Sequence, residues 1–466
     1  MHRRGAESAP HSAPLIWLAL AYTVFVVYGS LVPLDFRPRP WAEAIQMFRH
    51  IRYLQLGIGS RADWVSNILL FIPLSFLWTG AWWSRRHLWW NLLAAPLVLA
   101  AAASLSVAIE FTQLFFPPRT VSINDLFAES IGAVLGILVW WVAGPKILNW
   151  ARSWRADSEP ASVWIRLLVA YLALLIGYSL LPLDITISPV EVFHKWRNGR
   201  VVLVPFSFLF KAPIDALYGL TTDVLIWIPV GALWCLGSRR PRVKVWMAAT
   251  LVAIALEVLQ LGIYSRVSDI TDIFTASLGV ACGILAVTRR FSEPAPGASH
   301  SEVRGIAWLP LLFAGVWCGG LITLFWYPFE FTADRATLVE RVNNLTQAPF
   351  TAYYYGTEFR AITEVFHKVG LFIPLGILLG IAVSPIQSPR WRGFVRFCAV
   401  GFIAFFALGI EAGQLLLPDK NADLTDLALE IIGGWGGFFG LSRLLARQRR
   451  QRDRLRRPSR HLRQPR

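Results

Sequence analysis

Long apolar runs alternate with short polar connections along the whole chain. Each run is about 20 residues long, which is the length that a helix needs to cross a bilayer. Such spans are helical because the lipid core offers no partners for free backbone groups. The pattern predicts twelve spanning helices, at 14–34, 64–83, 92–116, 122–143, 163–183, 217–237, 244–264, 269–288, 306–328, 361–384, 394–417 and 423–443. The first run follows Arg3 and Arg4 and lacks a clear cleavage site, which predicts an uncleaved first helix.

The polar positions reveal an internal repeat. Segments 109–136, 256–283 and 410–437 align without a gap. Each has a Glu, a Gln three residues later, a basic residue six residues after the Gln, and an Asp six residues further on. The residues are Glu110, Gln113, Arg119 and Asp125 in the first segment, Glu257, Gln260, Arg266 and Asp272 in the second, and Glu411, Gln414, Lys420 and Asp426 in the third. A repeat of this period indicates tandem copies of one structural unit.

The repeat extends upstream into the second span of each unit. Pro73, Pro229 and Pro374 each lie six residues after a polar residue, which is Asn67, Asp223 or Lys368. We expect each proline to kink its helix. The sequence thus predicts an all-α integral membrane protein of three tandem four-helix units, at 1–150, 151–295 and 296–446, followed by a basic cytoplasmic tail at 447–466.

A pair of glycines ends each repeated segment. The two glycines are four residues apart, a spacing that lets two membrane helices approach closely. The pairs are Gly132 and Gly136, Gly279 and Gly283, and Gly433 and Gly437. We interpret them as helix-packing positions.

The connection between the first and second spans carries apolar residues at helical spacing. Trp41, Ile45, Phe48 and Ile51 predict an amphipathic helix lying in the membrane interface. It could serve as a surface helix that covers the bundle or as a functional lid.

Composition supports a membrane protein and narrows the choice of ligands. Hydrophobic residues make up 55% of the chain and charged residues 16%, against about 25% charged in soluble proteins. The net charge of +16 is concentrated in short connections and in the tail after Leu441, where arginine sets topology and attracts anionic lipid. Nucleic acid is therefore not an expected partner. The four cysteines form no CxxC pair, and we expect neither a metal nor a cofactor.

Basic residues also predict the orientation of the chain. With twelve spans, both termini lie on one side of the membrane, and that side carries more Lys and Arg. The positive-inside rule then places both termini in the cytoplasm. The repeated Glu, basic and Asp positions would consequently lie near the outer face.

The repeated polar residues are the candidate binding residues. The helical hairpin between the third and fourth spans can bring a carboxylate, an amide, a cation and a second carboxylate together. One interpretation is a polar network that locks the hairpin. The other is a polar pocket that opens outward, because a carboxylate at this depth needs a partner or a wet cavity.

The third unit alone adds a histidine to this set. Glu364, His367 and Lys368 precede its proline, so Glu411, His367 and Asp426 are weak candidates for acid–base catalysis. A histidine near the start of a span is also a common interfacial polar residue.

Taken together, these motifs resemble the VanZ-like family. The first unit matches the family pattern at Asp63, Asn67, Glu110, Gln113, Arg119, Ser122, Asp125, Gly132 and Gly136. The units depart from it where the family has Asn before the glycines, since Glu129, Ala276 and Glu430 stand there. The second unit has Gly219 at the leading acidic position, and the third has Lys420 in place of Arg.

The resemblance implies a bacterial envelope protein, since the named member of the family is associated with low-level resistance to teicoplanin, a glycopeptide antibiotic. We expect a multi-pass protein of the bacterial cytoplasmic (inner) membrane that contacts membrane lipids and binds a lipid-linked or glycan envelope precursor at the outer leaflet. The alternatives are a membrane-embedded enzyme acting on an envelope lipid, and a transporter. Unlike inverted repeats, units of four spans all keep one orientation.

Overall fold

The computed structural model describes most of the chain. It covers residues 13–53, 57–83, 88–117, 119–156, 160–186, 188–210, 213–291, 307–332, 338–339, 341–342, 345, 349–351, 358–386, 388–418, 420 and 422–456. The tail predicted at 447–466 lies outside the described residues from 457 onward.

Helices account for nearly all of the regular structure, as the sequence predicts. Unit one contains α1 (Ala13–Leu31), α2 (Trp41–Arg49), α3 (Ile58–Trp82), α4 (Leu88–Gln113) and α5 (Ile123–Ala156). Unit two contains α6 (Pro160–Leu180), α7 (Pro189–Arg197), β1 (Val201–Val202), η1 (Ser207–Phe210), α8 (Pro213–Gly237), α9 (Arg242–Leu261), β2 (Ser268–Asp269) and α10 (Ile270–Phe291). Unit three contains α11 (Trp308–Trp326), α14 (Glu358–Val383), α15 (Pro389–Leu415) and α16 (Leu424–Arg456).

The described residues contain ten helices that are long and apolar enough to cross a membrane. The two remaining predicted spans fall in α11, whose apolar stretch is the shorter Pro310–Trp326, and in α16. Helix α16 is less apolar at its start because Asp426, Glu430 and several glycines interrupt its hydrophobic residues. The prediction of an all-α membrane protein built from three four-helix units is confirmed.

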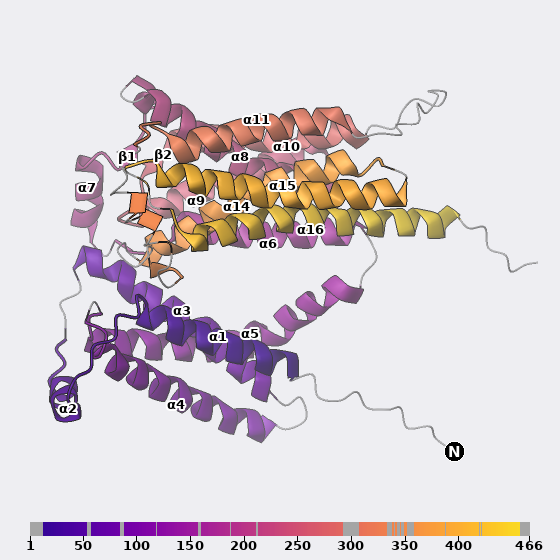
Figure 1. Cartoon of the computed structure of the whole chain (residues 1–466). Helices are drawn as coiled ribbons and strands as arrows, with labels where there is room; N and C mark the ends of the chain where they lie inside the picture. The colour runs from indigo at the N-terminus through magenta and orange to yellow at the C-terminus, as the bar shows by residue number, and fades with distance from the viewer. Residues whose placement is uncertain are drawn as a thin grey trace, which may run out of the picture.

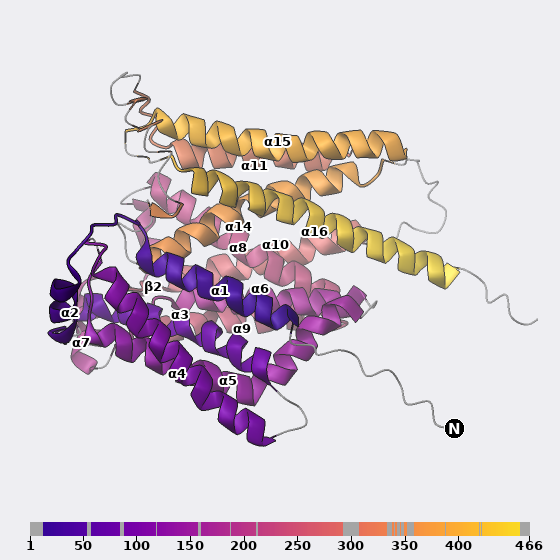
Figure 2. The same cartoon turned by 60° about the horizontal axis from the view of Figure 1, so that its bottom comes forward.

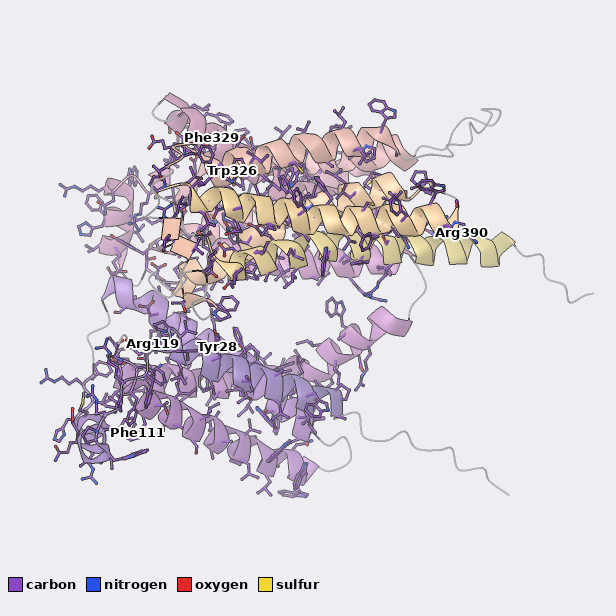
Figure 3. All side chains as sticks on the ribbon, in the orientation of Figure 1. Tyr28, Phe111, Arg119, Trp326, Phe329 and Arg390 are labelled. Atoms are coloured by element: carbon purple, nitrogen blue, oxygen red, sulfur yellow. The ribbon has the colours of Figure 1, made fainter. Side chains whose placement is uncertain are left out.

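Three units lie with their corresponding ends together (Figure 1). The short helices α2 and α7 and the turns between the third and fourth helices lie at one end of the bundle, which we call the hairpin end. Helix α1 begins and helix α16 ends at the opposite end. Figure 3 shows Arg119 and Trp326 toward the hairpin end and Arg390 toward the other. Figure 2 shows the same bundle turned to bring unit one forward.

The amphipathic connection of unit one forms the short helix α2. Its aromatic side chains pack on α4, because Trp41 stacks on Phe111 with ring centroids 5.8 Å apart and Phe48 meets the same ring at 5.4 Å. Ile51 lies beyond the end of α2 at Arg49. The prediction of a helix between the first and second spans is confirmed.

Polar bonds at the hairpin end link each unit to the other two. Arg61 of unit one donates to both carboxylate oxygens of Glu191 in unit two, at 3.1 and 3.0 Å. The hydroxyl of Tyr178 in unit two lies 3.3 Å from Nε2 of His367 in unit three. The hydroxyl of Tyr28 in unit one donates to the carbonyl of Pro349 in unit three at 2.7 Å. The units therefore meet around the hairpin end.

Within each unit, the second and fourth helices form the most extensive pair, and glycine makes this possible. A Cβ atom on Gly132 would overlap the carbonyl oxygen of Ile68, and one on Gly136 would overlap that of Ile72. The same holds for Gly279 and Gly283 against α8, and for Gly433 and Gly437 against α14. The glycine pairs thus lie at the closest approach of two helices, where the sequence predicts helix packing.

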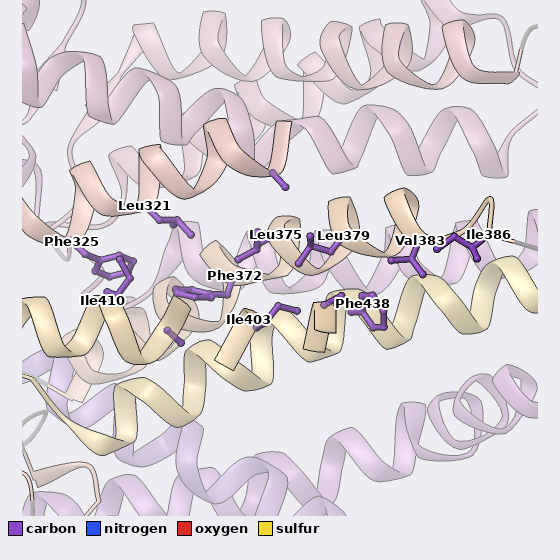
Figure 4. Packing of buried hydrophobic residues seen from close by; sticks show 13 residues of the cluster. Leu321, Phe325, Phe372, Leu375, Leu379, Val383, Ile386, Ile403, Ile410 and Phe438 are labelled. Carbon is purple, nitrogen blue, oxygen red and sulfur yellow. The ribbon is translucent and has the colours of Figure 1, made fainter. Parts of the chain in front are cut away.

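Apolar side chains fill the space around this helix pair. In unit three, Phe372, Leu375, Ile403 and Phe438 are each at most 1% exposed and form one cluster with residues of α11 (Figure 4). This apolar core occupies the middle of the unit, so its buried polar groups are gathered toward the hairpin end.

Two adjacent glycines of α16 provide a test of the close approach between α16 and α14. We expect Gly437→Ala to lower the free energy of unfolding by about 1–3 kcal/mol, because its Cβ would displace the backbone of α14. Gly436→Ala is the matched control, since nothing lies within 4 Å of its Cβ position. Thermal unfolding of the purified variants in detergent measures the difference. Equal melting temperatures for the two variants would contradict the packing assignment.

Candidate functional site

The repeated Glu of each unit binds the backbone of the fourth helix at its beginning. One carboxylate oxygen accepts the N–H of the residue immediately before the helix. The pairs are Glu110 with Ser122 at 3.2 Å, Glu257 with Asp269 at 3.1 Å, and Glu411 with Asp423 at 3.1 Å. The first backbone N–H groups of a helix lack partners within it, and the helix dipole favours a negative charge there. This bond therefore joins the third helix to the fourth in every unit.

A second repeated bond joins the third helix to the first. Nε2 of Gln113 donates to the carbonyl of Ser30 at 3.0 Å, and Nε2 of Gln260 donates to that of Ser179 at 3.2 Å. In unit three, a tryptophan joins the first helix to the third. Nε1 of Trp326 on α11 donates to the carbonyl of Ile410 on α15 at 3.0 Å.

The repeated arginine covers the carboxyl end of the first helix. Arg119 donates from Nε to the carbonyl of Val32 at 2.8 Å and from Nη2 to that of Gly29 at 2.7 Å. Arg266 makes the equivalent bonds to Leu181 and Tyr178 in unit two. Free carbonyls and the negative end of the helix dipole both favour a cation at this place.

Lys420 does not take over these bonds in unit three. Its backbone N–H donates to Leu417 at 3.2 Å, and its side chain makes no corresponding bond with the residues that the structure describes. Arg341 instead donates to the carbonyls of Leu415, Leu417 and Pro418, at the end of α15. In unit three, a cation thus covers the end of the third helix.

Unit two uses a lysine in a similar way. Lys195 of α7 is fully buried, and its ammonium donates to the carbonyl of Ile263 at 2.7 Å, to the carbonyl of Gln260 and to the hydroxyl of Ser268. Neither Lys195 nor Arg341 stands out in the sequence. They lie in connections that align poorly between units, and no spacing relates them to the repeat.

Burial lowers the pKa of Lys195 to about 8, although the nearby carboxylates of Asp184 and Glu257 raise it and Arg200 lowers it further. Burial raises the pKa of Asp184, whereas hydrogen bonds from Ser265 oppose this shift. Lys195 therefore remains charged at neutral pH but loses its proton more easily than an exposed lysine.

The repeated Asp faces a position that differs in all three units. In unit one, Asp125 accepts a hydrogen bond from Nδ2 of Asn67 at 2.8 Å and one from Oγ of Ser122 at 2.6 Å. Asn67 is the residue six before the proline of α3. The corresponding residues are Asp223 on α8 and Lys368 on α14, so one position holds an amide, an acid or an amine. We call this the variable position.

In unit three, the variable position places an ammonium among three carboxylates. Nζ of Lys368 lies 2.8 Å from Asp426, 3.2 Å from Glu411 and 3.5 Å from Glu430. The Lys368 residue is 6% exposed and Glu430 is fully buried. Nζ also lies 4.6 Å from the centre of the Phe325 ring. Such a buried cluster depends on its single ammonium, because removing it would leave the carboxylates buried without any counter-charge.

In unit two, carboxylates border a cavity. The cavity has a volume of about 160 Å³ and lies among α6, α8, α9 and α10. Its polar lining includes the carboxyl groups of Asp223, Glu257 and Asp272, together with Gln260 and Arg266. In unit two, the repeated polar residues thus bond to neighbouring backbone and also border a cavity.

His367 lies apart from the two carboxylates with which the sequence analysis grouped it. Glu411 and Asp426 face Lys368, whereas His367 lies next to Tyr178 of unit two, with ring centroids 6.0 Å apart. A pair of adjacent residues on one helix points in directions about 100° apart. The contact of His367 shown by the structure is therefore one between units. Among the described residues, no group of three or more His, Cys, Asp or Glu side chains has the geometry to hold a metal ion.

Removal of the Lys368 amine tests whether the unit-three carboxylates depend on it. We expect Lys368→Met to lower the free energy of unfolding by about 3–5 kcal/mol, because buried carboxylates would lose their counter-charge. Lys420→Met is the control, and we expect it to change stability by less than about 0.5 kcal/mol. The measurement is thermal unfolding of both purified variants. A loss of stability that is equal in the two variants would count against the ion cluster.

The pKa of Lys195 generates a prediction about pH. Its value of about 8 in the folded protein lies below the ordinary 10.5, so the unfolded chain binds more protons between these pH values. The contribution of Lys195 to the free energy of unfolding therefore rises between pH 8 and pH 10.5. We expect the melting temperature of the wild type, minus that of Lys195→Met, to increase from pH 8 to pH 10.5. A difference that falls over this range would contradict the assignment.

Comparison with known proteins agrees with the threefold repeat. The family model described as VanZ/LLP1 matches the chain three times, at residues 14–144, 168–291 and 311–446. A search of curated proteins and a search of solved structures found no match. The three matched ranges correspond to the three four-helix units.

Proposed function

The chain belongs to the VanZ family of membrane proteins, and on that premise we propose that it binds a lipid-linked or glycan precursor of the cell envelope at the outer leaflet of the bacterial cytoplasmic membrane. The observation that carries this proposal is the unit-two cavity, which is lined by Asp223, Glu257 and Asp272 beside the turn between α9 and α10. Ligand sites are commonly concave and place a few polar groups so that they converge, and a cavity of about 160 Å³ takes one small group of such a precursor.

Orientation supports an outward-facing site. Arg239, Arg240 and Arg242 lie at the start of α9, which is the end opposite to its turn with α10, and the sequence after Leu441 is rich in arginine. The positive-inside rule assigns that end to the cytoplasm. The hairpin end, with α2 and α7, then meets the outer leaflet. An amphipathic helix such as α2 suits this interface, since Trp41 is 69% exposed although it stacks on α4.

Binding accounts for the polar residues better than catalysis does. Glu411 and Asp426 both engage the amine of Lys368, and His367 lies next to Tyr178. A general acid or base needs to reach the substrate proton, and these groups are already engaged within the protein. The repeated units have one orientation, which also differs from the inverted repeats of many transporters.

Sensitivity to glycopeptide antibiotics provides the cellular test. The triple variant Glu110→Gln, Glu257→Gln, Glu411→Gln keeps an acceptor for each helix-end N–H but removes the three charges. If a carboxylate binds the precursor, the loss of one charge-assisted hydrogen bond to it costs about 1.5–3 kcal/mol, or roughly tenfold or more in affinity for the precursor. We therefore expect altered teicoplanin sensitivity and altered pools of lipid-linked precursor in cells that depend on this protein.

The control for this experiment is Glu330→Gln, which makes the same change at an exposed residue of a connection. Expression and melting temperature of the purified proteins verify folding. Mass spectrometry of co-purified lipids and glycans identifies the bound precursor. A well-folded triple variant with unchanged sensitivity and unchanged co-purified molecules would refute the proposed function.

A further inference from the structure

We propose that the unit-two cavity binds the primary ammonium group of a ligand, in the place that the Lys368 ammonium occupies in unit three. The inference rests on the proposed function for the origin of the ligand, an amine-bearing molecule that enters from the hairpin end. The ammonium group can belong to a lipid headgroup or to a soluble amine. In both cases the recognised chemistry is the same.

Unit three provides the internal reference for such a site. Its carboxylates at the repeated Glu and Asp positions, Glu411 and Asp426, bind one ammonium at 3.2 and 2.8 Å. That ammonium reaches the site from the variable position of α14, and the ring of Phe325 lies beside it. We call the hairpin between the third and fourth helices, with its repeated Glu and Asp, the frame of a unit. This frame can therefore hold an ammonium between its two carboxylates.

In unit two, the same two positions hold carboxylates, but the variable position supplies no amine. Asp223 stands there and adds a third carboxyl group to the cavity lined by Glu257 and Asp272. Within the part of the chain that the structure describes, no side chain donates a hydrogen bond to Asp223 or Asp272. Arg266 also lines the cavity and offsets one negative charge, but its Nε and Nη2 donate to carbonyls at the end of α6. Hydrogen-bond acceptors therefore outnumber donors in this cavity.

Gln260 adds a buried acceptor to this cavity. The corresponding Gln113 of unit one has the same unpartnered oxygen, so it is the combination with the cavity that distinguishes unit two. Gln260 lines the cavity and is 8% exposed. Its Nε2 donates to Ser179, which orients the amide, and its Oε1 has no hydrogen-bond partner among the described atoms. A buried acceptor without a partner costs free energy. A ligand that donates hydrogen bonds would remove this cost.

A primary ammonium fits these groups better than other cations do. It carries three N–H donors, which can serve a carboxylate, a second carboxylate and Oε1 of Gln260 together. Tyr178 and Trp227 line the same cavity, and aromatic rings favour a nearby cation, as Arg266 over the Tyr178 ring shows. The volume of about 160 Å³ accommodates a small aminoalkyl group. A metal ion is less suited, since the described carboxylates do not converge in a ligating geometry.

The direct experiment measures binding of ethylammonium to the full-length protein in detergent. We expect ethylammonium chloride to raise the melting temperature in a saturable way, whereas sodium chloride at the same ionic strength does not. Isothermal titration calorimetry gives the Kd. No saturable effect, or an equal effect of sodium, would overturn the proposal, because carboxyl protonation or a simple ion would then account for the cavity.

Two substitutions at the variable position sharpen the test. Asp223→Lys places an ammonium of the protein in the cavity, as in unit three, and we expect it to abolish ethylammonium binding while the protein remains folded. Asp223→Asn reproduces the residue of unit one, and we expect it to raise the Kd by roughly tenfold or more. The asparagine variant decides the matter if the lysine variant fails to fold. Unchanged binding in a folded variant would refute the site.

A matched variant in unit three tests the internal reference. Lys368→Ala removes the ammonium together with most of its side chain, which leaves room for a small ligand beside the corresponding carboxylates. We expect ethylammonium to recover part of the lost melting temperature of this variant, with sodium again ineffective. The absence of any recovery would count against the claim that the shared frame accepts a free ammonium.

Lipid nanodiscs separate the two sources of the amine. One set contains phosphatidylglycerol alone and the other adds phosphatidylethanolamine, with native mass spectrometry recording the retained lipid. Retention of phosphatidylethanolamine that is lost in Asp223→Lys identifies a lipid headgroup, whereas binding of ethylammonium without such retention identifies a soluble amine. Both results support an ammonium site. If the triple Glu variant leaves drug sensitivity unchanged while the wild-type protein binds ethylammonium, the proposed function fails and the site stands.

Discussion

The bond between the repeated Glu and the backbone N–H immediately before the fourth helix is the interaction on which the rest of each unit depends. It places a carboxylate of the third helix against a backbone N–H that has no partner within the fourth helix. The bond fixes the turn between these helices. It also sets the position of the fourth helix, whose glycines then pack against the second. Since all three units make it, the hairpin is a constant frame, and differences between units arise from what faces the frame.

The variable position decides what the frame holds. Asn67 donates a neutral hydrogen bond to Asp125, which leaves unit one closed. Lys368 contributes a full charge, and the third unit becomes an ion cluster. Asp223 contributes another acid, and its unit borders a cavity in which Oε1 of Gln260 has no hydrogen-bond partner. In units one and three, a side chain at the variable position thus binds the repeated Asp. The second is completed by a ligand on our proposal, so triplication leaves one binding unit supported by two structural ones.

The sequence predicts the architecture well because the hydrophobic pattern and the repeat report directly on helices and on their order. The glycine pairs could also be assigned, since small residues four apart have one common use in membrane helices. Asn67, Asp223 and Lys368 align in the sequence. The alignment does not show that they lie opposite the repeated Asp of each unit. That relation depends on how α3, α8 and α14 rotate against the fourth helices. Lys195, Arg341 and the contact between Tyr178 and His367 depend on connections and unit boundaries, where the repeat gives no guidance.

An experimental structure of the Asp223→Lys variant tests most directly the claim that one frame serves three units with different occupants. The account predicts that Glu257 still accepts the N–H of Asp269 and that the new ammonium lies between Glu257 and Asp272, as Lys368 lies between Glu411 and Asp426. A lysine turned away from the cavity, or a rearranged turn between α9 and α10, would contradict it.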